Sequence, residues 1–159
     1  MENIELSFGE IARVQSSYNN LNLNLMNVLA TFYARLHIIE PTFKMTTSPE
    51  YEIANRAIIS MLKLILSRLD NLDSLAIWLK PLGVKYQGRG IHDFYYASVG
   101  NALLQTLHFY LGAQFDAKTR VAWLNLYDVI ILHMLADIDE TKFVPGIEKS
   151  VVAALQYAA

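Results

Sequence analysis

The sequence predicts an all-α domain, and three observations support that prediction. Apolar residues recur at helical spacing along almost the whole chain. The sequence lacks the sustained alternation of apolar and polar residues between hairpin turns that is typical of β-strands. Prolines and capping residues divide the chain into long and short helical stretches. With 159 residues, these helices most simply form one domain with a sizeable core.

The first half of the chain is expected to contain three helices. The first covers about Ser7–Ser17 and the second Leu21–Ile39, which ends before Pro41 because the residue preceding a proline avoids the α conformation. Ser48-Pro49-Glu50 is typical of a helix start, with a capping hydroxyl, a proline and an acid in order. The third helix should run to about Leu69. Its apolar residues cover most of its circumference, which predicts burial on more than one side.

The second half is expected to contain two long helices and two short ones. Asp93 and Asp116 are placed to cap the long helices, and Gly112 fits the end of the first of them. The expected elements, in order, are a short helix over Leu72–Leu79 before Pro81, a glycine-rich loop over Gly83–Gly90, long helices from Asp93 to Leu111 and from Ala117 to about Asp137, and a short amphipathic helix over Gly146–Tyr157.

Composition excludes several classes of function. The net charge is −2 and the 13 basic residues are scattered, so no nucleic-acid partner is expected. The absence of cysteine excludes disulfides and thiolate metal sites. The acidic start has no signal-peptide pattern, and no apolar run reaches 18 residues, so we expect a cytoplasmic protein with no membrane span. No nucleophile elbow, phosphate loop or carboxylate pair is evident, and no enzymatic activity is predicted.

A set of short motifs matches one family in order and without a gap. The chain resembles bacterial and flavohaemoglobin-type globins, and the order of its long and short helices agrees. The resemblance implies a globin-like domain over residues 1–138 and a tail over 139–159 with the short helix. The matching motifs are Phe32-Tyr33, Arg35-Leu36, Pro41, Leu82-Gly83, Gly90-Ile91, Val99-Gly100, Ala102-Leu103-Leu104, Leu111-Gly112 and Ala122-Trp123.

The resemblance implies a haem pocket, but the haem-facing positions have changed. The iron-ligating histidine of the family falls at Tyr86, the distal glutamine or histidine at Ala54, and the phenylalanine that packs on the porphyrin at Thr47. Tyr33, at the distal tyrosine position of many bacterial globins, is retained. Because the scaffold positions persist while three of these four have changed, we expect no haem cofactor.

The losses resemble those of nonhaem globin sensor domains in bacterial signalling. This implies a haem-free sensor or regulatory module that binds a small apolar ligand in the former haem cavity, or acts through contacts with an unidentified regulatory protein. Tyr86 is also of a size to fill that space. The alternative is a haem globin in redox or gas sensing, with Tyr86 or His92 as axial ligand. A tyrosine ligand must ionise, from a pKa of about 10, and favours ferric iron.

The spacing of the histidines argues against a metal site, and the apolar residues of the last two long helices suggest a partner. The four histidines have no i, i+3 or i, i+4 spacing, so no helix-borne metal site is predicted. The two helices carry more apolar residues than one inward stripe requires, and globin-coupled sensors dimerise through these helices. A homodimer is therefore expected. The apolar residues in question include Tyr95, Leu103, Leu107, Tyr110, Leu124, Ile131 and Leu135.

Overall fold

The computed structural model describes residues 5–41, 49–87 and 93–135. These ranges contain α-helices and 3-10 turns and no strand, which confirms the all-α prediction. The helices are α1 (Phe8–Leu21), α2 (Leu25–Ile39), α3 (Pro49–Leu66), α4 (Ala76–Gln87), α5 (Asp93–Leu111) and α6 (Ala117–Leu135), and the turns are η1 (Asn22–Asn24), η2 (Leu72–Leu75) and η3 (Gly112–Gln114).

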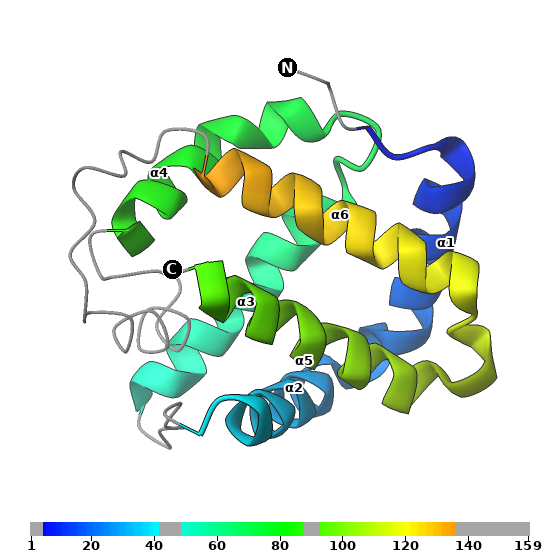
Figure 1. Ribbon diagram of the computed structural model, residues 1–159, viewed down its shortest axis with the longest axis horizontal. Helices are drawn as coiled ribbons and strands as arrows, with labels where there is room; N and C mark the ends of the chain where they lie inside the picture. The colour runs from blue at the N-terminus through cyan, green and yellow to red at the C-terminus, as the bar shows by residue number, and fades with distance from the viewer. Residues whose placement is uncertain (1–4, 42–48, 88–92, 136–159) are drawn as a thin grey trace.

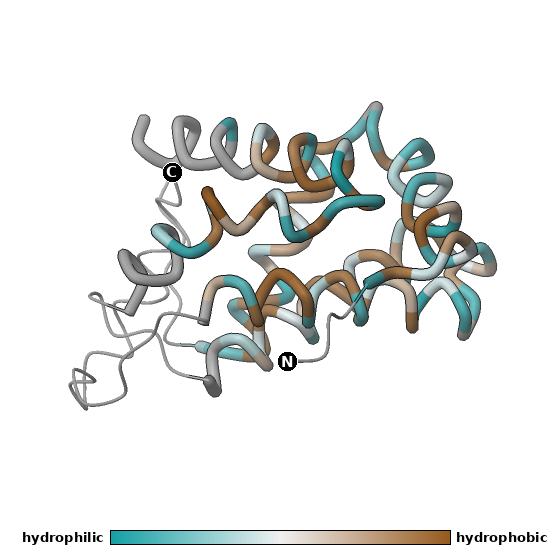
Figure 2. The backbone as a smooth tube through the Cα atoms, turned by 90° about the horizontal axis from the view of Figure 1, so that it is seen from above, coloured by the Kyte–Doolittle hydropathy of each residue, from teal (hydrophilic) through white to brown (hydrophobic). Residues whose placement is uncertain are grey.

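Helix α6 is the centre of the packing among the described elements. It crosses the front of the molecule in Figure 1, where it packs mainly on α4 and α1 and also contacts α5. Helix α2 packs mainly on α5. Hydrophobic and hydrophilic stretches alternate along the tube in Figure 2, as amphipathic helices around a shared core require.

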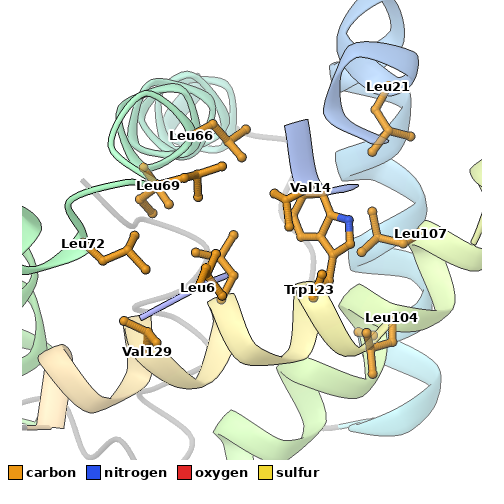
Figure 3. Packing of buried hydrophobic residues seen from close by; sticks show 14 of the residues in the cluster. Leu6, Val14, Leu21, Leu66, Leu69, Leu72, Leu104, Leu107, Trp123 and Val129 are labelled. Atoms are coloured by element: carbon orange, nitrogen blue, oxygen red, sulfur yellow. The ribbon is translucent and has the colours of Figure 1, made fainter. Parts of the chain in front are cut away.

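The core is built from leucines and a few small or aromatic side chains. Ala102 of α5 and Ala122 of α6 are fully buried, so both helices are closely covered at these positions. Figure 3 shows Val14 of α1 beside Trp123 of α6, with Leu6 near Val129. Burying each large apolar side chain contributes about 1.5–3 kcal/mol. The globin-like motif residues Leu104, Leu111 and Trp123 all belong to this core.

Helix α1 starts as predicted but extends beyond the predicted end. The Ser7 hydroxyl accepts from the Glu10 amide, and a Glu10 carboxylate oxygen accepts from the Ser7 amide, both at 3.1 Å. Glu10 also accepts a hydrogen bond from Asn125 of α6. Burial opposes ionisation of Glu10, but the bonds from Asn125 and Ser7 outweigh it and hold the pKa below its ordinary value. The predicted end at Ser17 is wrong because Leu21 is buried, and this packing overrides the weak helix propensity of Asn19-Asn20.

Helix α4 contradicts the predicted boundary at Pro81. The helix runs through Pro81 and Gly83 to Gln87, so the predicted loop over Gly83–Gly90 is wrong as far as residue 87. Pro81 has no amide to donate to the carbonyl of Ile77. Ile77 is exposed, so water can satisfy that carbonyl. Leu79, which is almost fully buried, anchors the helix in the core.

Helix α3 begins at Pro49 as predicted and ends three residues before the predicted end. Residues 67–70 form a turn, in which the Ser67 amide bonds to the carbonyls of both Lys63 and Leu64, at 3.0 and 3.2 Å. Leu69 then packs into the core from the turn. Burial on more than one side is borne out only in part: Ile65 and Leu66 are buried, whereas the other described apolar residues of α3 are half-buried, namely Ile59, Met61, Leu62 and Leu64.

Both later helices start at the predicted residues, and the first of them also ends as predicted; the predicted end of the second, at about Asp137, lies outside the described residues. Helix α5 runs from Asp93 to Leu111, and Gly112 has φ +54°, a left-handed conformation that glycine adopts without strain. Asp116 caps α6 by accepting from the Thr119 amide at 2.8 Å. Among the described helices, none combines the length and apolarity needed to cross a membrane. The predicted helix over Gly146–Tyr157 and the tail boundary at 139 lie outside the described residues.

Candidate functional site

The predicted pocket residues are distributed over three helices and two segments outside the described ranges. Tyr33 lies on α2, Ala54 on α3 and Tyr86 on α4. The backbone of Ala54 and Tyr86 is helical, but their side chains are not among those described. Thr47 and His92 lie outside the described residues altogether. Tyr33 is therefore the one pocket residue whose surroundings can be read directly.

Tyr33 is completely enclosed. None of its surface is exposed, so no gap wide enough for a water molecule borders it. The ring of Phe32 meets that of Tyr33 edge-on, with centroids 5.4 Å apart. Leu36, one turn later, is also almost fully buried. An open cavity beside Tyr33 would leave part of its side chain accessible, so the interior is filled at this point.

A second set of tyrosines ties α5 to its neighbours. The Tyr110 hydroxyl donates to the Asn27 carbonyl of α2 at 3.0 Å and lies 2.7 Å from the Thr31 hydroxyl. The Tyr127 hydroxyl of α6 donates to the Tyr96 carbonyl of α5. Burial, with smaller contributions from Tyr96 and Asp128, raises the pKa of Tyr127. Tyr127 is therefore a neutral donor in this interface.

Close packing between α5 and α6 depends on Gly100. A Cβ atom at this position would lie 3.0 Å from Cε1 of Tyr127, and the Tyr127 ring is held by its bond to the Tyr96 carbonyl. The Val99-Gly100 motif was first noted because it matches a family pattern. The contact with Tyr127 adds a physical reason for glycine at position 100.

Comparison with known proteins decides the family. A family model for globins matches residues 31–134. The chain belongs to the globin family. Neuroglobin of Dissostichus mawsoni is 30% identical to this globin over 135 residues, covering 76% of this chain and 85% of the relative. Neuroglobin of Tetraodon nigroviridis is 30% identical over 144 residues, covering 82% and 91%.

These relatives are fish proteins, and they give no support to the predicted bacterial and flavohaemoglobin-like subtype. The family prediction itself is confirmed, together with the fold that it implied. The matched range begins two residues before Tyr33 and ends one residue before the end of α6. It therefore includes every predicted pocket residue of this globin.

The two described helices that carry predicted haem-facing positions other than Tyr33 supply no imidazole. Neither α3 nor α4, which carry Ala54 and Tyr86, contains a histidine. The described histidines lie elsewhere. His37 and His108 are exposed, on α2 and α5, and His133 of α6 has its Nε2 3.5 Å from Asp73 Oδ1. Within the described ranges, no cluster of three or more histidine, aspartate and glutamate side chains is arranged to hold a metal ion.

The apolar excess on the last two long helices lies mostly toward the interior. Among the described members of the predicted set, Leu107 is buried and the others are half-buried. Among the described side chains of α5 and α6, the large apolar ones that are exposed are Phe109, Val121 and Leu132. The homodimer stays a prediction, and the described part of its predicted surface offers fewer exposed apolar side chains than the sequence suggested.

A groove that the sequence did not predict lies where α2, the end of α5 and the start of α6 meet. Its volume is about 410 Å³, and its charged lining residues are Arg35, Asp116 and Arg120. Arg35 lies far from Asp116 and Arg120 in the sequence, and the three belong to no common motif. The sequence singled out Arg35 as part of the Arg35-Leu36 match to the family and Asp116 as a helix cap, but it did not single out Arg120.

Proposed function

We propose that this globin works without haem, as a regulatory module whose state is read through contacts with another protein. The observation that carries the proposal is the identity of Tyr86. Leu82-Gly83 before it and Gly90-Ile91 after it match the globin pattern, and that pattern puts the iron ligand at Tyr86. A phenol must lose its proton to ligate iron, at a pKa of about 10, whereas a neutral imidazole binds directly.

Two further observations support a haem-free state. Ala54, at the distal position, has no side-chain donor for a bound ligand. Tyr33, the described residue on the distal side, is fully enclosed, so no ligand-sized space borders its side chain. A small apolar ligand in the remaining haem space stays part of the proposal, and the enclosure of Tyr33 favours protein contacts as the main route of the signal.

The proposal includes a cytoplasmic location, a homodimer through α5 and α6, and an unidentified regulatory protein as partner. The competing function is a haem globin with Tyr86 or His92 as axial ligand. Titration of the purified protein with hemin, followed by absorption spectroscopy, separates the two functions. Native mass spectrometry of the same preparation tests for a co-purified apolar ligand, since a bound lipid adds a defined mass to the chain.

A further inference from the structure

The groove between α2, α5 and α6 has an apolar floor and an aromatic rim. Leu104 and Phe115 form the floor and are almost completely buried. Phe109 stands at the rim with 60% of its surface exposed. The groove has a volume of about 410 Å³, which is in the range of ligand sites, and it opens to solvent. Exposed aromatic side chains beside a groove are typical anchors for a partner's apolar side chain.

The groove carries positive charge that the described part of the chain does not neutralise. Arg35 and Arg120 line it, and neither forms an ion pair with any described residue. The acid in the lining, Asp116, is already engaged by Arg13 at 3.3 Å and by the Thr119 amide. Arg35 and Arg120 therefore give the groove two positive charges that no described acid balances, in a chain whose net charge is −2.

Arg35 is held in a suitable position to receive an acid. Its guanidinium carbon lies 5.7 Å from the centroid of the Phe109 ring, so the aromatic face supports the cation. A guanidinium presents parallel N–H donors that match the two oxygens of a carboxylate. Arg120, across the groove on the first turn of α6, supplies a second such fork. Asn101 and Gln105 on α5 add neutral hydrogen-bonding groups to the same wall.

We infer that this groove binds an acidic segment of a partner protein, with carboxylates on Arg35 and Arg120 and an apolar side chain on Phe109 and the floor. The inference deepens the proposed function by naming the chemistry of the partner. Charge complementarity selects the occupant, since a basic segment would meet two unpaired arginines. Binding at this groove does not involve Tyr86 or any other residue of the former haem pocket.

The test uses a fluorescein-labelled peptide of sequence Asp-Glu-Leu-Asp-Glu-Leu and fluorescence anisotropy with the full-length chain. A matched peptide has lysine in place of each acid. The groove variant is Arg35→Gln with Arg120→Gln. The control variant is Arg56→Gln with Lys63→Gln, which removes the same charge from exposed positions on α3. Circular dichroism verifies that both variants keep their helical content.

We expect the acidic peptide to bind the wild-type chain and the lysine peptide not to bind. The groove variant should weaken binding about tenfold or more, because two charge-assisted contacts are lost. The control variant should stay within about twofold, and Phe109→Ala should weaken binding through the apolar contact alone. No binding to the wild-type chain at about 1 mM would overturn the inference. Equal losses in the groove and control variants would do so too, since they would indicate general attraction.

Sedimentation velocity without peptide tests whether a second copy of the chain, rather than a partner protein, occupies the groove. Self-association that the groove variant abolishes and the control variant retains would overturn the assignment to a partner protein. The outcome is independent of the proposed function, because peptide binding is measured without hemin. If the peptide does not bind and the chain takes up no haem, the inference about the acidic partner is wrong and the proposed haem-free function stands. If the chain takes up haem and still binds the peptide, the haem-free function is wrong and the inference about the groove stands.

Discussion

Arg13 of α1 and Asp116 at the start of α6 form an ion pair across the α1–α6 interface, with Arg13 Nη1 3.3 Å from both carboxylate oxygens. The same carboxylate caps α6 by accepting from the Thr119 amide at 2.8 Å. Arg13 also reaches the Thr119 hydroxyl, at 3.4 Å. Asp116 thus joins a helix start to a tertiary contact, and its engagement leaves the neighbouring groove positively charged.

Replacing Asp116 should lower stability in a graded and pH-dependent way. Asp116→Asn retains a capping oxygen and loses the ion pair, whereas Asp116→Ala loses both, so thermal unfolding midpoints should fall in that order. The Thr119 amide and hydroxyl, and then Arg13, lower the pKa of Asp116. Because the folded-state pKa is depressed, the stabilisation is present above the unfolded-state pKa and is lost as the pH falls below about 4. A difference between wild type and Asp116→Ala that persists unchanged at pH 2 would contradict this role.

Gly100→Ala should destabilise the protein although alanine favours helices. The added Cβ would lie 3.0 Å from Tyr127 Cε1, and the hydrogen bond to the Tyr96 carbonyl restrains that ring. Overpacking costs about 1–3 kcal/mol, which exceeds the gain of about 1 kcal/mol in helix propensity. Denaturant unfolding measures the difference. The control is Asn101→Ala at the exposed neighbouring position, which should be neutral or slightly stabilising, and an equally stable Gly100→Ala variant would rule out the close contact.

Trp123→Phe should change the free energy of unfolding by less than about 1 kcal/mol, because two effects oppose each other. The indole Nε1 is buried and has no hydrogen-bond partner among the described residues, which costs about 1–3 kcal/mol. The smaller phenylalanine ring loses a similar amount through a cavity. Trp123→Ala should instead cost about 3–5 kcal/mol. Urea denaturation of the two variants compares these values, and a large loss in Trp123→Phe would show that Nε1 has an essential partner.

Tyr86→His alone should not create stable haem binding. The substitution supplies an imidazole on α4 but leaves Ala54 without a donor, Thr47 in place of an aromatic residue, and Tyr33 enclosed. We expect a weak, non-saturating spectral response to hemin. Stoichiometric uptake by this single variant would mean that the pocket is intact apart from its ligand. Tyr86→Phe serves as the control, since it alters the same position without offering a ligand.

Local signals in the sequence predicted the ends of elements where they agreed with the packing. Pro49, Gly112 and Asp116 each mark a boundary at the expected residue. Pro81 and Gly83 predicted a boundary that α4 does not have, because burial of Leu79 outweighs a missing backbone bond near an exposed turn. Proline and glycine signals indicate the local free-energy cost of continuing a helix. A helix continues past them when tertiary packing, such as the burial of Leu79, contributes more than that cost.

The candidate sites differ in how far the sequence could predict them. Tyr33 and Tyr86 were found by their positions in a family pattern. Such a pattern indicates which residue occupies a haem-facing position, but it does not indicate how deeply that side chain is buried. The basic groove was missed because Arg35 and Arg120 come from two helices far apart in the sequence and share no spacing. Only the packing of α2 on α5, and of α5 on α6, brings them to one groove.

The most direct test of the haem-free account is the absorption spectrum of the purified chain during titration with hemin. The account predicts no Soret band as purified and a broad, non-saturating change on addition, because α3 and α4 contain no histidine and Tyr33 on α2 is fully enclosed. A sharp Soret band that saturates at about one haem per chain would contradict the account, and its loss in Tyr86→Phe would identify Tyr86 as the axial ligand.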